Sequence, residues 1–258
     1  MTYKIAFANE KGGVAKTTSV LSVSAALVEL GHTVLMVDMD AQANLTLAMG
    51  IEPGKVSPSI AQILLSSAEP VTVQLETGIP NLFILPSNNE ISMAERMLPS
   101  HAGYEMTLSR ALEGLIFDFI IIDCPPHLGA LTLNALNAAD LLIMPTQAEY
   151  FSVYALRNMM NLIKRIRAQY NQQLKYRLLL TMFSRRNRIH RTLFEQLHTT
   201  FGSGMLETVI EMDTKLRESQ IAGLPIIYHA PKSRSALQYR ALTQEVLAYV
   251  QETTEQPA

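Results

Sequence analysis

The sequence contains one cysteine, Cys124, and no tryptophan. A single cysteine excludes an internal disulfide, and it excludes zinc or iron–sulfur sites that need several cysteines of one chain. Scarce cysteine is typical of a reducing compartment, so we expect a cytoplasmic protein. Long apolar runs are absent too: no stretch approaches the roughly 20 residues of a membrane span. The run that begins at residue 3 is too short for a secretory signal.

Neither sign of charge dominates. Lysine and arginine number 21 and aspartate and glutamate 23, which gives a net charge of −2. Any binding to a polyanion must therefore come from a local basic patch. Hydrophobic residues make up 48% and charged residues 17%, which is typical of a globular protein rather than a disordered one. We expect residues 1–258 to form one domain.

Hydrophobic patterns predict strands that alternate with helices. The expected strands are residues 3–8, 33–37, 81–85, 117–123, 140–144, 177–183, 206–210 and 225–228. The expected helices are residues 17–30, 60–65, 91–98, 131–138, 152–167, 192–200, 212–220 and 235–251. This alternation predicts an α/β fold with a doubly wound, mostly parallel sheet and helices on both faces.

Residues 9–18 read Asn-Glu-Lys-Gly-Gly-Val-Ala-Lys-Thr-Thr and connect the first strand to the first helix. In such a loop, backbone N–H groups and the helix dipole attract phosphate, and a lysine adds a full positive charge. We expect Lys16 on the β- and γ-phosphates and the Thr17 hydroxyl on Mg²⁺. The predicted nucleotide-binding residues are Lys11, Gly12, Gly13, Val14, Ala15, Lys16, Thr17 and Thr18.

Two buried strands end in carboxylates, at the edge where open α/β sheets bind ligands. Asp38 and Asp40 follow residues 33–37, and Asp123 closes the apolar run 117–123. An apolar strand ending in one aspartate is typical of a Walker B strand, whose carboxylate holds Mg²⁺ mainly through water. Asp38 is a further candidate for supporting Mg²⁺ from outside its coordination sphere.

Three segments together resemble the ParA/Soj-type partition ATPases of the ParA/MinD superfamily. Residues 11–17 are similar to the deviant Walker A box Lys-Gly-Gly-x-Gly-Lys-Thr, with Ala15 in place of glycine. Residues 38–44 resemble Asp-x-Asp-Pro-Gln-x-Asn, and residues 123–129 resemble the switch loop Asp-Cys-Pro-Pro-Ser-Leu-Gly, with His127 in place of serine. The resemblance covers nearly the whole chain. Without a long N-terminal extension, it looks like the short subclass that lacks a helix-turn-helix.

The resemblance implies a slow, Mg²⁺-dependent ATPase that binds ATP and ADP. In this family the lysine at the position of Lys11 reaches across an ATP-bound homodimer to the partner's nucleotide. The implied catalytic residues are Lys11, Lys16 and Asp40, with Asp40 orienting the attacking water. The family's partner is a ParB-type centromere-binding protein that stimulates hydrolysis.

The resemblance also implies non-specific binding to double-stranded DNA, and therefore association with the nucleoid. Four arginines fall within residues 185–191, and two more basic residues follow in the segment 212–220. The predicted DNA-binding residues are Arg185, Arg186, Arg188, Arg191, Lys215 and Arg217. The family pattern Ile-Pro-Arg-Asn-x-Arg-Leu reads Ile-Glu-Met-Asp-Thr-Lys-Leu at 210–216, so its Pro-Arg pair is missing.

Two alternatives stay open at this point. The cargo is a plasmid, a chromosome origin or a non-DNA body positioned on the nucleoid, and the sequence does not separate these. A MinD-like division regulator that cycles on and off the membrane is a second class. It needs a basic amphipathic C-terminal helix, whereas residues 251–255 read Gln-Glu-Thr-Thr-Glu. We therefore expect no membrane partner.

Overall fold

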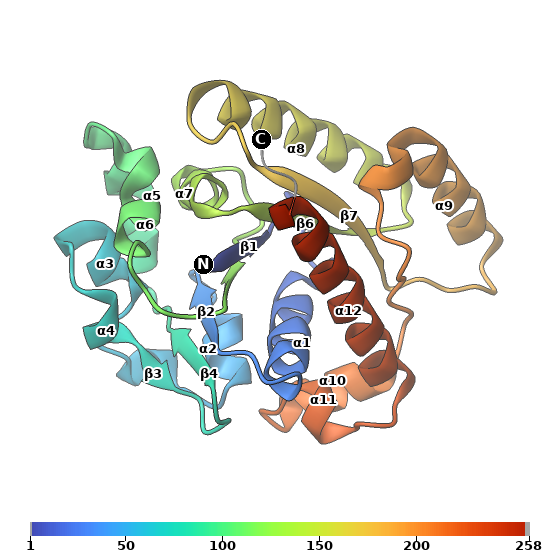
Figure 1. Ribbon diagram of the computed structural model, residues 1–258, viewed down its shortest axis with the longest axis horizontal. Helices are drawn as coiled ribbons and strands as arrows, with labels where there is room; N and C mark the ends of the chain where they lie inside the picture. The colour runs from blue at the N-terminus through green and yellow to red at the C-terminus, as the bar shows by residue number, and fades with distance from the viewer. Residues whose placement is uncertain (1, 256–258) are drawn as a thin grey trace.

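A computed structural model describes residues 2–255, leaving the side chains of residues 150–153, 254 and 255 outside the description. Its seven strands form one sheet with the order β3-β4-β2-β5-β1-β6-β7 (Figure 1). The strands are β1 (Tyr3–Phe7), β2 (Val34–Asp38), β3 (Leu75–Glu76), β4 (Leu82–Leu85), β5 (Phe119–Asp123), β6 (Leu141–Gln147) and β7 (Lys175–Thr181). All neighbours are parallel except β3 and β4.

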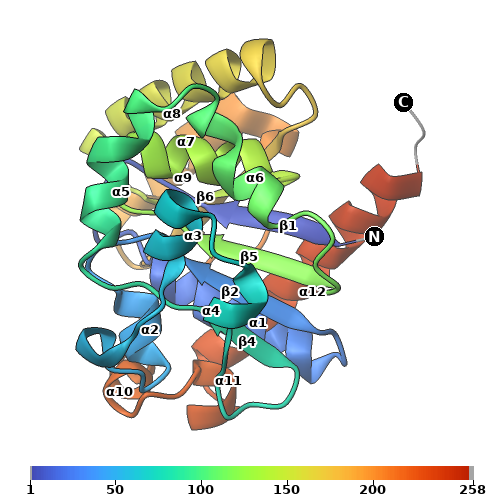
Figure 2. The ribbon, with the colours of Figure 1, turned by 90° about the vertical axis from the view of Figure 1, so that its left-hand side faces the viewer.

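Helices cover both faces of the sheet (Figure 2). On one face lie α1 (Lys16–Glu29), α2 (Asn44–Ala48), α10 (Thr214–Ile221), α11 (Ile226–His229) and α12 (Arg234–Glu255). On the other lie α3 (Ile60–Ser66), α4 (Pro70–Val73), α5 (Ile91–Met97), α6 (Thr107–Ala111), α7 (Ala130–Ala138), α8 (Tyr150–Gln169) and α9 (Arg188–Phe201). Short 3₁₀ turns are Pro53–Lys55, Leu98–Ser100, Tyr104–Met106 and Gly202–Gly204. Within residues 2–255, no helix combines the length and apolarity needed to cross a bilayer.

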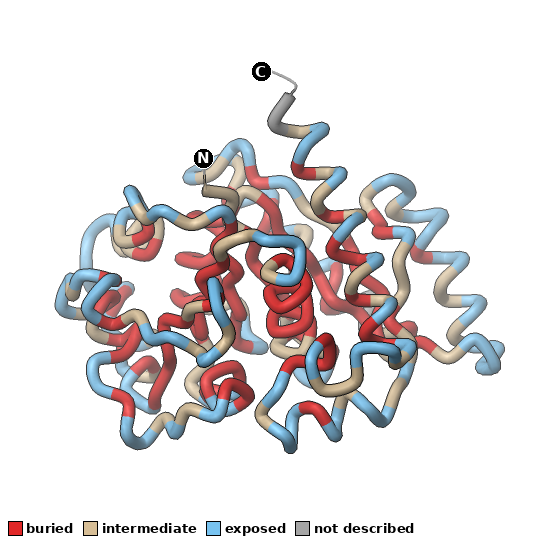
Figure 3. Tube along the Cα trace, turned by 60° about the horizontal axis from the view of Figure 1, so that its bottom comes forward, coloured by how far each residue is buried: buried red, intermediate tan, exposed pale blue. Residues whose placement is uncertain are grey.

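Two hydrophobic cores lie on opposite sides of the sheet. In β1, Ile5 and Phe7 are buried in the core shared with α1 and α12, whereas Ala6 is buried in the core beneath α7 and α8. A strand buried on both faces has an almost continuous apolar sequence, which is the pattern that predicted these strands. Figure 3 shows the buried sheet and the buried α1 at the centre of the molecule. The predicted doubly wound, mostly parallel fold is confirmed.

The predicted strand at residues 206–210 is wrong. The segment lies beside β7, and the N–H groups of Leu206 and Ile210 donate to the carbonyls of Leu178 and Leu180, both at 2.9 Å. These contacts do not make a continuous ladder, and the isolated bridges lie just outside the segment, at Met205 and Glu211. Leu206 and Ile210 are buried because the segment covers the edge of β7.

The predicted strand at residues 225–228 is also wrong, because Ile226–His229 form α11. Pro225 precedes the first turn, where a missing N–H and a fixed φ are compatible with a helix start. Ile226 and Ile227 are both buried against the core that contains α1. A short apolar run after proline therefore has two possible structures, and packing selects the helical one.

Candidate nucleotide-binding site

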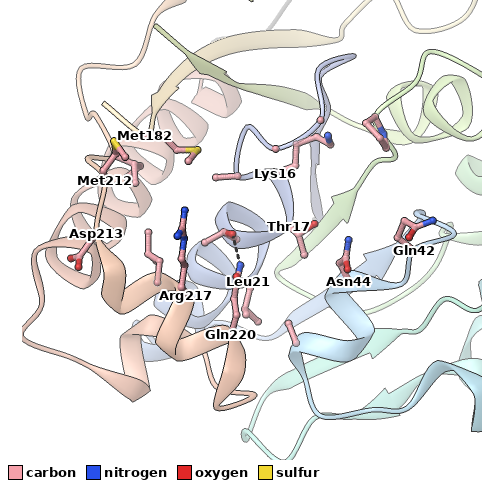
Figure 4. A pocket seen from close by; sticks show the side chains of 18 of the residues that line it. Lys16, Thr17, Leu21, Gln42, Asn44, Met182, Met212, Asp213, Arg217 and Gln220 are labelled. Carbon is pink, nitrogen blue, oxygen red and sulfur yellow. Dashed lines mark hydrogen bonds between the residues drawn. The ribbon is translucent and has the colours of Figure 1, made fainter. Parts of the chain in front are cut away.

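Three neighbouring strands bring the predicted motifs to one edge of the sheet. Phe7 pairs with Asp123 between β1 and β5, and Asp38 pairs with Asp123 between β2 and β5. A pocket of about 760 Å³ opens at this edge (Figure 4), and we call it the P-loop pocket. It is lined by Gly12, Gly13, Ala15, Lys16, Thr17, Thr18, Leu21, Asp40, Gln42, Asn44, Leu47, Ala48, Pro126, Met182, Ile210, Glu211, Met212, Asp213, Thr214, Leu216, Arg217 and Gln220.

The loop that follows β1 turns into α1 through a left-handed residue. Ala15 has a φ of +64° and is the N-cap of α1, so the helix begins at Lys16. Left-handed backbone costs alanine about 1 kcal/mol relative to glycine, and the surrounding structure holds it there. The Gln147 side chain donates to the carbonyl of Gly13 at 2.9 Å, and the Thr181 hydroxyl donates to that of Val14 at 3.0 Å.

Gln147 and Thr181 therefore fix the loop from β6 and β7. Sequence reasoning missed both residues, because each lies more than a hundred positions from the loop. A polar residue at the end of a buried strand was the available signal.

Lys16, Thr17 and Asp123 form the centre of the site. The Thr17 hydroxyl donates to Oδ2 of Asp123 at 2.6 Å. Oδ1 of Asp123 is buried and has no hydrogen-bond partner among the described residues. Burial raises the pKa of Asp123, and burial likewise lowers the pKa of Lys16, although Asp123 opposes this second shift. The site thus combines a hydroxyl, a half-satisfied carboxylate and an ammonium.

Asp38 organises the loop after β2. Its Oδ1 accepts the N–H of Asp40 at 3.1 Å, and its Oδ2 accepts the N–H and hydroxyl of Thr46 at 2.9 and 2.7 Å. Burial raises the pKa of Asp38 to about 6, against the effect of these hydrogen bonds. Asp40 lines the pocket, and its Oδ1 accepts the N–H of Gln42 at 3.0 Å. Asp38 therefore positions the segment that presents Asp40.

Lys11 points away from the P-loop pocket. Its ammonium forms an ion pair with Glu149 and donates to Oε1 of Gln147 at 3.1 Å. Both partners lie at or just after the end of β6. Of the eight predicted nucleotide-binding residues, the pocket is lined by Gly12, Gly13, Ala15, Lys16, Thr17 and Thr18, and not by Lys11 or Val14.

The loop after β5 is anchored by a residue that sequence reasoning did not select. Glu95 of α5 accepts the N–H groups of Ala130 and Leu131, at 2.8 and 2.9 Å, at the start of α7. Nε2 of His127 lies 3.4 Å from Oε2 of Glu95. Cys124 is fully buried, and burial raises the pKa of its thiol, so it is not a reactive nucleophile.

The six basic residues predicted for DNA binding lie in different surroundings. Nε of Arg185 donates to Glu211 at 2.8 Å, and Nζ of Lys215 donates to Glu218 at 2.6 Å. Arg217 lines the P-loop pocket. All six are exposed, and the remaining three lie in the loop after β7 and at the start of α9: Arg186, Arg188 and Arg191.

Comparison with known proteins gives matches along the whole chain. The AAA domain family matches residues 2–176. The sporulation initiation inhibitor protein Soj of Bacillus subtilis is 37% identical over 247 residues, covering 95% of this chain and 98% of that protein. The chromosome-partitioning ATPase Soj of Treponema pallidum is 34% identical over 247 residues, with coverage of 95% and 96%.

A solved structure has the same architecture. The Mycobacterium smegmatis protein named cobyrinic acid a,c-diamide synthase, with bound ATP analogue and magnesium, is 34% identical. The match has a TM-score of 0.86 and covers 100% of this chain and 99% of that one. With the strand–loop–helix at residues 3–29 and the carboxylates of β2 and β5, these matches show that the chain belongs to the ParA/Soj family of partition ATPases.

Proposed function

We propose that this chain is a Mg²⁺-dependent ATPase, folded as one domain over residues 1–258, that cycles between an ATP-bound homodimer on DNA and a released form. The observation that carries the proposal is the contact between Thr17 and Asp123 beside the buried Lys16. A hydroxyl, an aspartate and a lysine in this arrangement are the parts that phosphoryl transfer by P-loop proteins requires.

The donor groups fit a hydrated Mg²⁺. Thr17 would bind the ion directly and Asp123 through water, and the unpartnered Oδ1 of Asp123 is a buried acceptor that such a water satisfies. When bound, the ion neutralises charge on the phosphates. The ATP analogue and magnesium in the Mycobacterium smegmatis structure support the same ligands here.

The chain's own residues then have distinct tasks in hydrolysis. Lys16 holds the β- and γ-phosphates, and Asp40 orients the attacking water from the loop fixed by Asp38. An aspartate is a weak base near neutral pH, so orientation is its main contribution. Lys11 acts across the dimer on the partner's triphosphate once it leaves Glu149.

Phosphate contacts to DNA need positive charge and reach rather than a fixed geometry. The exposed Arg186, Arg188 and Arg191 supply both at the start of α9. Arg185 and Lys215 belong to the same proposed surface, although each is bound to a glutamate in this structure. DNA binding by the dimer would place the protein on the nucleoid, and a ParB-type partner would stimulate its release.

Analytical ultracentrifugation with a non-hydrolysable ATP analogue tests the cycle. We expect a dimer with the analogue and a monomer with ADP. Lys16→Ala should abolish nucleotide binding, whereas Asp40→Ala should dimerise and fail to hydrolyse ATP. A wild-type protein that stays monomeric with bound analogue would contradict the proposal.

A DNA titration at several salt concentrations tests the proposed DNA binding. About 4–6 phosphate contacts predict that log K falls with log salt with a slope of about −0.9 per contact, and a flat response would remove the DNA role. Adding the product of the neighbouring reading frame should raise ATP turnover if it encodes the ParB-type partner.

A further inference from the structure

α10 forms one wall of the P-loop pocket and is held in place from both ends. Asp213 caps its first turn, where its side chain accepts the N–H of Lys215 at 3.0 Å. Near the other end, the Gln220 amide donates to the hydroxyl of Thr18, in the first turn of α1, at 2.8 Å. Side chains that α10 directs into the pocket therefore keep a defined position relative to the P-loop (Figure 4).

Arg217 is one of these side chains. Among the described residues that line the pocket, Lys16 and Arg217 are the two cations. Arg217 has neither an ion pair nor a side-chain hydrogen bond to any residue whose side chain the structure describes. Its neighbour Lys215, in contrast, is bound to Glu218. Arg217 is therefore an exposed cation that lines the pocket and is not neutralised by an ion pair.

The surroundings of Arg217 differ from those of Lys16. In Figure 4, Arg217 points toward Met182, with Met212 and Asp213 on one side and Gln220 and Leu21 on the other. Ile210 and Leu216 line the same end of the pocket. This end thus combines apolar side chains with Arg217 and with the carboxylates of Glu211 and Asp213, whereas the other end carries Lys16 and Thr17. Both carboxylates are already engaged, Glu211 by two arginines outside the pocket and Asp213 by the first turn of α10.

A nucleotide has the same two-part chemistry. Its phosphates need the backbone N–H groups and ammonium of the P-loop, and its base is a flat aromatic surface. A guanidinium stacks on an aromatic face, and thioether and aliphatic side chains pack well around it. Figure 4 shows Gln42 and Asn44, which follow Asp40 in the chain, on the side of Thr17 away from Arg217. With the phosphates at Lys16 and the attacking water at Asp40, the nucleoside would extend toward the end that contains Arg217.

We propose that Arg217 is a nucleotide-binding residue, whose guanidinium stacks on the base of bound ATP or ADP, and that it is not part of the DNA surface. The proposal rests on the proposed function, because it uses the same nucleotide site. It assigns α10 the task of holding the nucleoside half of the ligand.

Isothermal titration calorimetry with ADP and with a non-hydrolysable ATP analogue tests this assignment. Because the base is common to both ligands, Arg217→Ala should weaken both by the same factor, about tenfold. Arg217→Lys keeps the positive charge but lacks the planar guanidinium, so it should bind both nucleotides at least about fivefold more weakly than wild type. Arg165→Ala, which removes an exposed arginine of α8 outside the pocket, is the matched control and should bind like wild type.

Two results would overturn the assignment: dissociation constants of Arg217→Ala equal to wild type, or a loss confined to the ATP analogue. The second result would place the guanidinium at the γ-phosphate. A wild-type protein that binds neither ligand would instead refute the proposed function itself. If Arg217→Ala fails to fold in a thermal melt without nucleotide, the Arg217→Lys comparison decides.

DNA binding supplies an independent readout. At saturating nucleotide, Arg217→Ala should bind duplex DNA as wild type does, whereas Arg186→Ala should bind it more weakly. Loss of DNA binding by Arg217→Ala with unchanged nucleotide affinity would overturn the reassignment.

Discussion

Lys11 and Glu149 form an ion pair within one chain, and Gln147 binds the same ammonium. In the proposed dimer this ammonium belongs to the partner's triphosphate, so the intrachain pair must open first. Lys11 is 25% and Glu149 50% exposed, so solvent screens the pair and makes it weak enough to break. Opening this ion pair thus adds a small free-energy cost to dimer formation.

Glu149→Gln should therefore favour the dimer. Each of the two protomers must open one such pair, and an exposed pair is worth about 0–1 kcal/mol. We therefore expect the dissociation constant of the analogue-bound dimer to fall by up to about thirtyfold. Sedimentation equilibrium measures this. Glu52→Gln, which breaks a surface pair with Lys55, is the control and should leave the dimer unchanged. A weaker dimer in Glu149→Gln would mean that Glu149 contributes to the interface.

Thr17→Ala should remove most of the Mg²⁺ dependence of nucleotide binding. The substitution removes a proposed Mg²⁺ ligand and the hydroxyl that donates to Asp123. We expect affinity at saturating Mg²⁺ to fall at least about tenfold, with a smaller change in EDTA. Thr17→Ser keeps the hydroxyl and should bind like wild type. Calorimetry across a Mg²⁺ titration checks this, and an unchanged Mg²⁺ response in Thr17→Ala would exclude the assignment.

Asp38 should make stability depend on pH in the nucleotide- and Mg²⁺-free protein. Its pKa is about 6 when folded, because the carboxyl is buried, and about 3.9 when unfolded. Because the folded pKa is the higher of the two, the Asp38 carboxyl contributes its full stabilisation at a pH below the unfolded pKa. This stabilisation is lost as the pH rises through the folded pKa. The advantage of wild type over Asp38→Asn should therefore shrink by about 1 kcal/mol between pH 5 and pH 7.

Urea unfolding at both pH values measures this difference. The control is Asp118→Asn, because hydrogen bonds from Thr33 lower the pKa of the Asp118 carboxyl. That group titrates at lower pH, so its substitution should have the same effect at both values. A constant difference for Asp38→Asn would show that the carboxyl stays ionised in the folded protein.

Two alanines occupy left-handed backbone next to the site, and replacing either with glycine should stabilise the protein. Ala15 has a φ of +64° and Ala43 a φ of +50°. Glycine relieves the strain but adds entropy to the unfolded chain, so we expect a net gain of about 0.5 kcal/mol at each position. Ala241→Gly, at an exposed position in the interior of α12, should instead cost about 1 kcal/mol. If thermal or urea unfolding showed that Ala15→Gly destabilises the protein as Ala241→Gly does, the backbone strain at Ala15 would be contradicted.

Local pattern was sufficient for most of the fold. Parallel strands buried on both faces leave continuous apolar runs, and Asp123 was found because its strand ends in one carboxylate. The strands expected at 206–210 and 225–228 failed because a short apolar run does not distinguish an edge-covering segment or a helical turn from a strand. β3, α2, α4 and α6 were missed because each is too short to show a period.

The site was predictable only where its residues are close in sequence. The P-loop motif identified Lys16 and Thr17 directly. Glu149, Glu95 and Arg217 acquire their roles from contacts between distant segments, and Lys11 is 138 positions from Glu149. Arg217 was grouped with surface arginines because a charge pattern does not state which way one turn of α10 faces.

α7 is buried along its entire length, and Glu95 fastens its first turn to α5. At the other end of the loop before α7, Asp123 belongs to the central sheet. Residues 124–129 thus connect two buried elements, and their two consecutive prolines restrict the backbone of the first half. A conformational change that the γ-phosphate causes on this side of the molecule must therefore be confined to those six residues, because both of their ends are anchored.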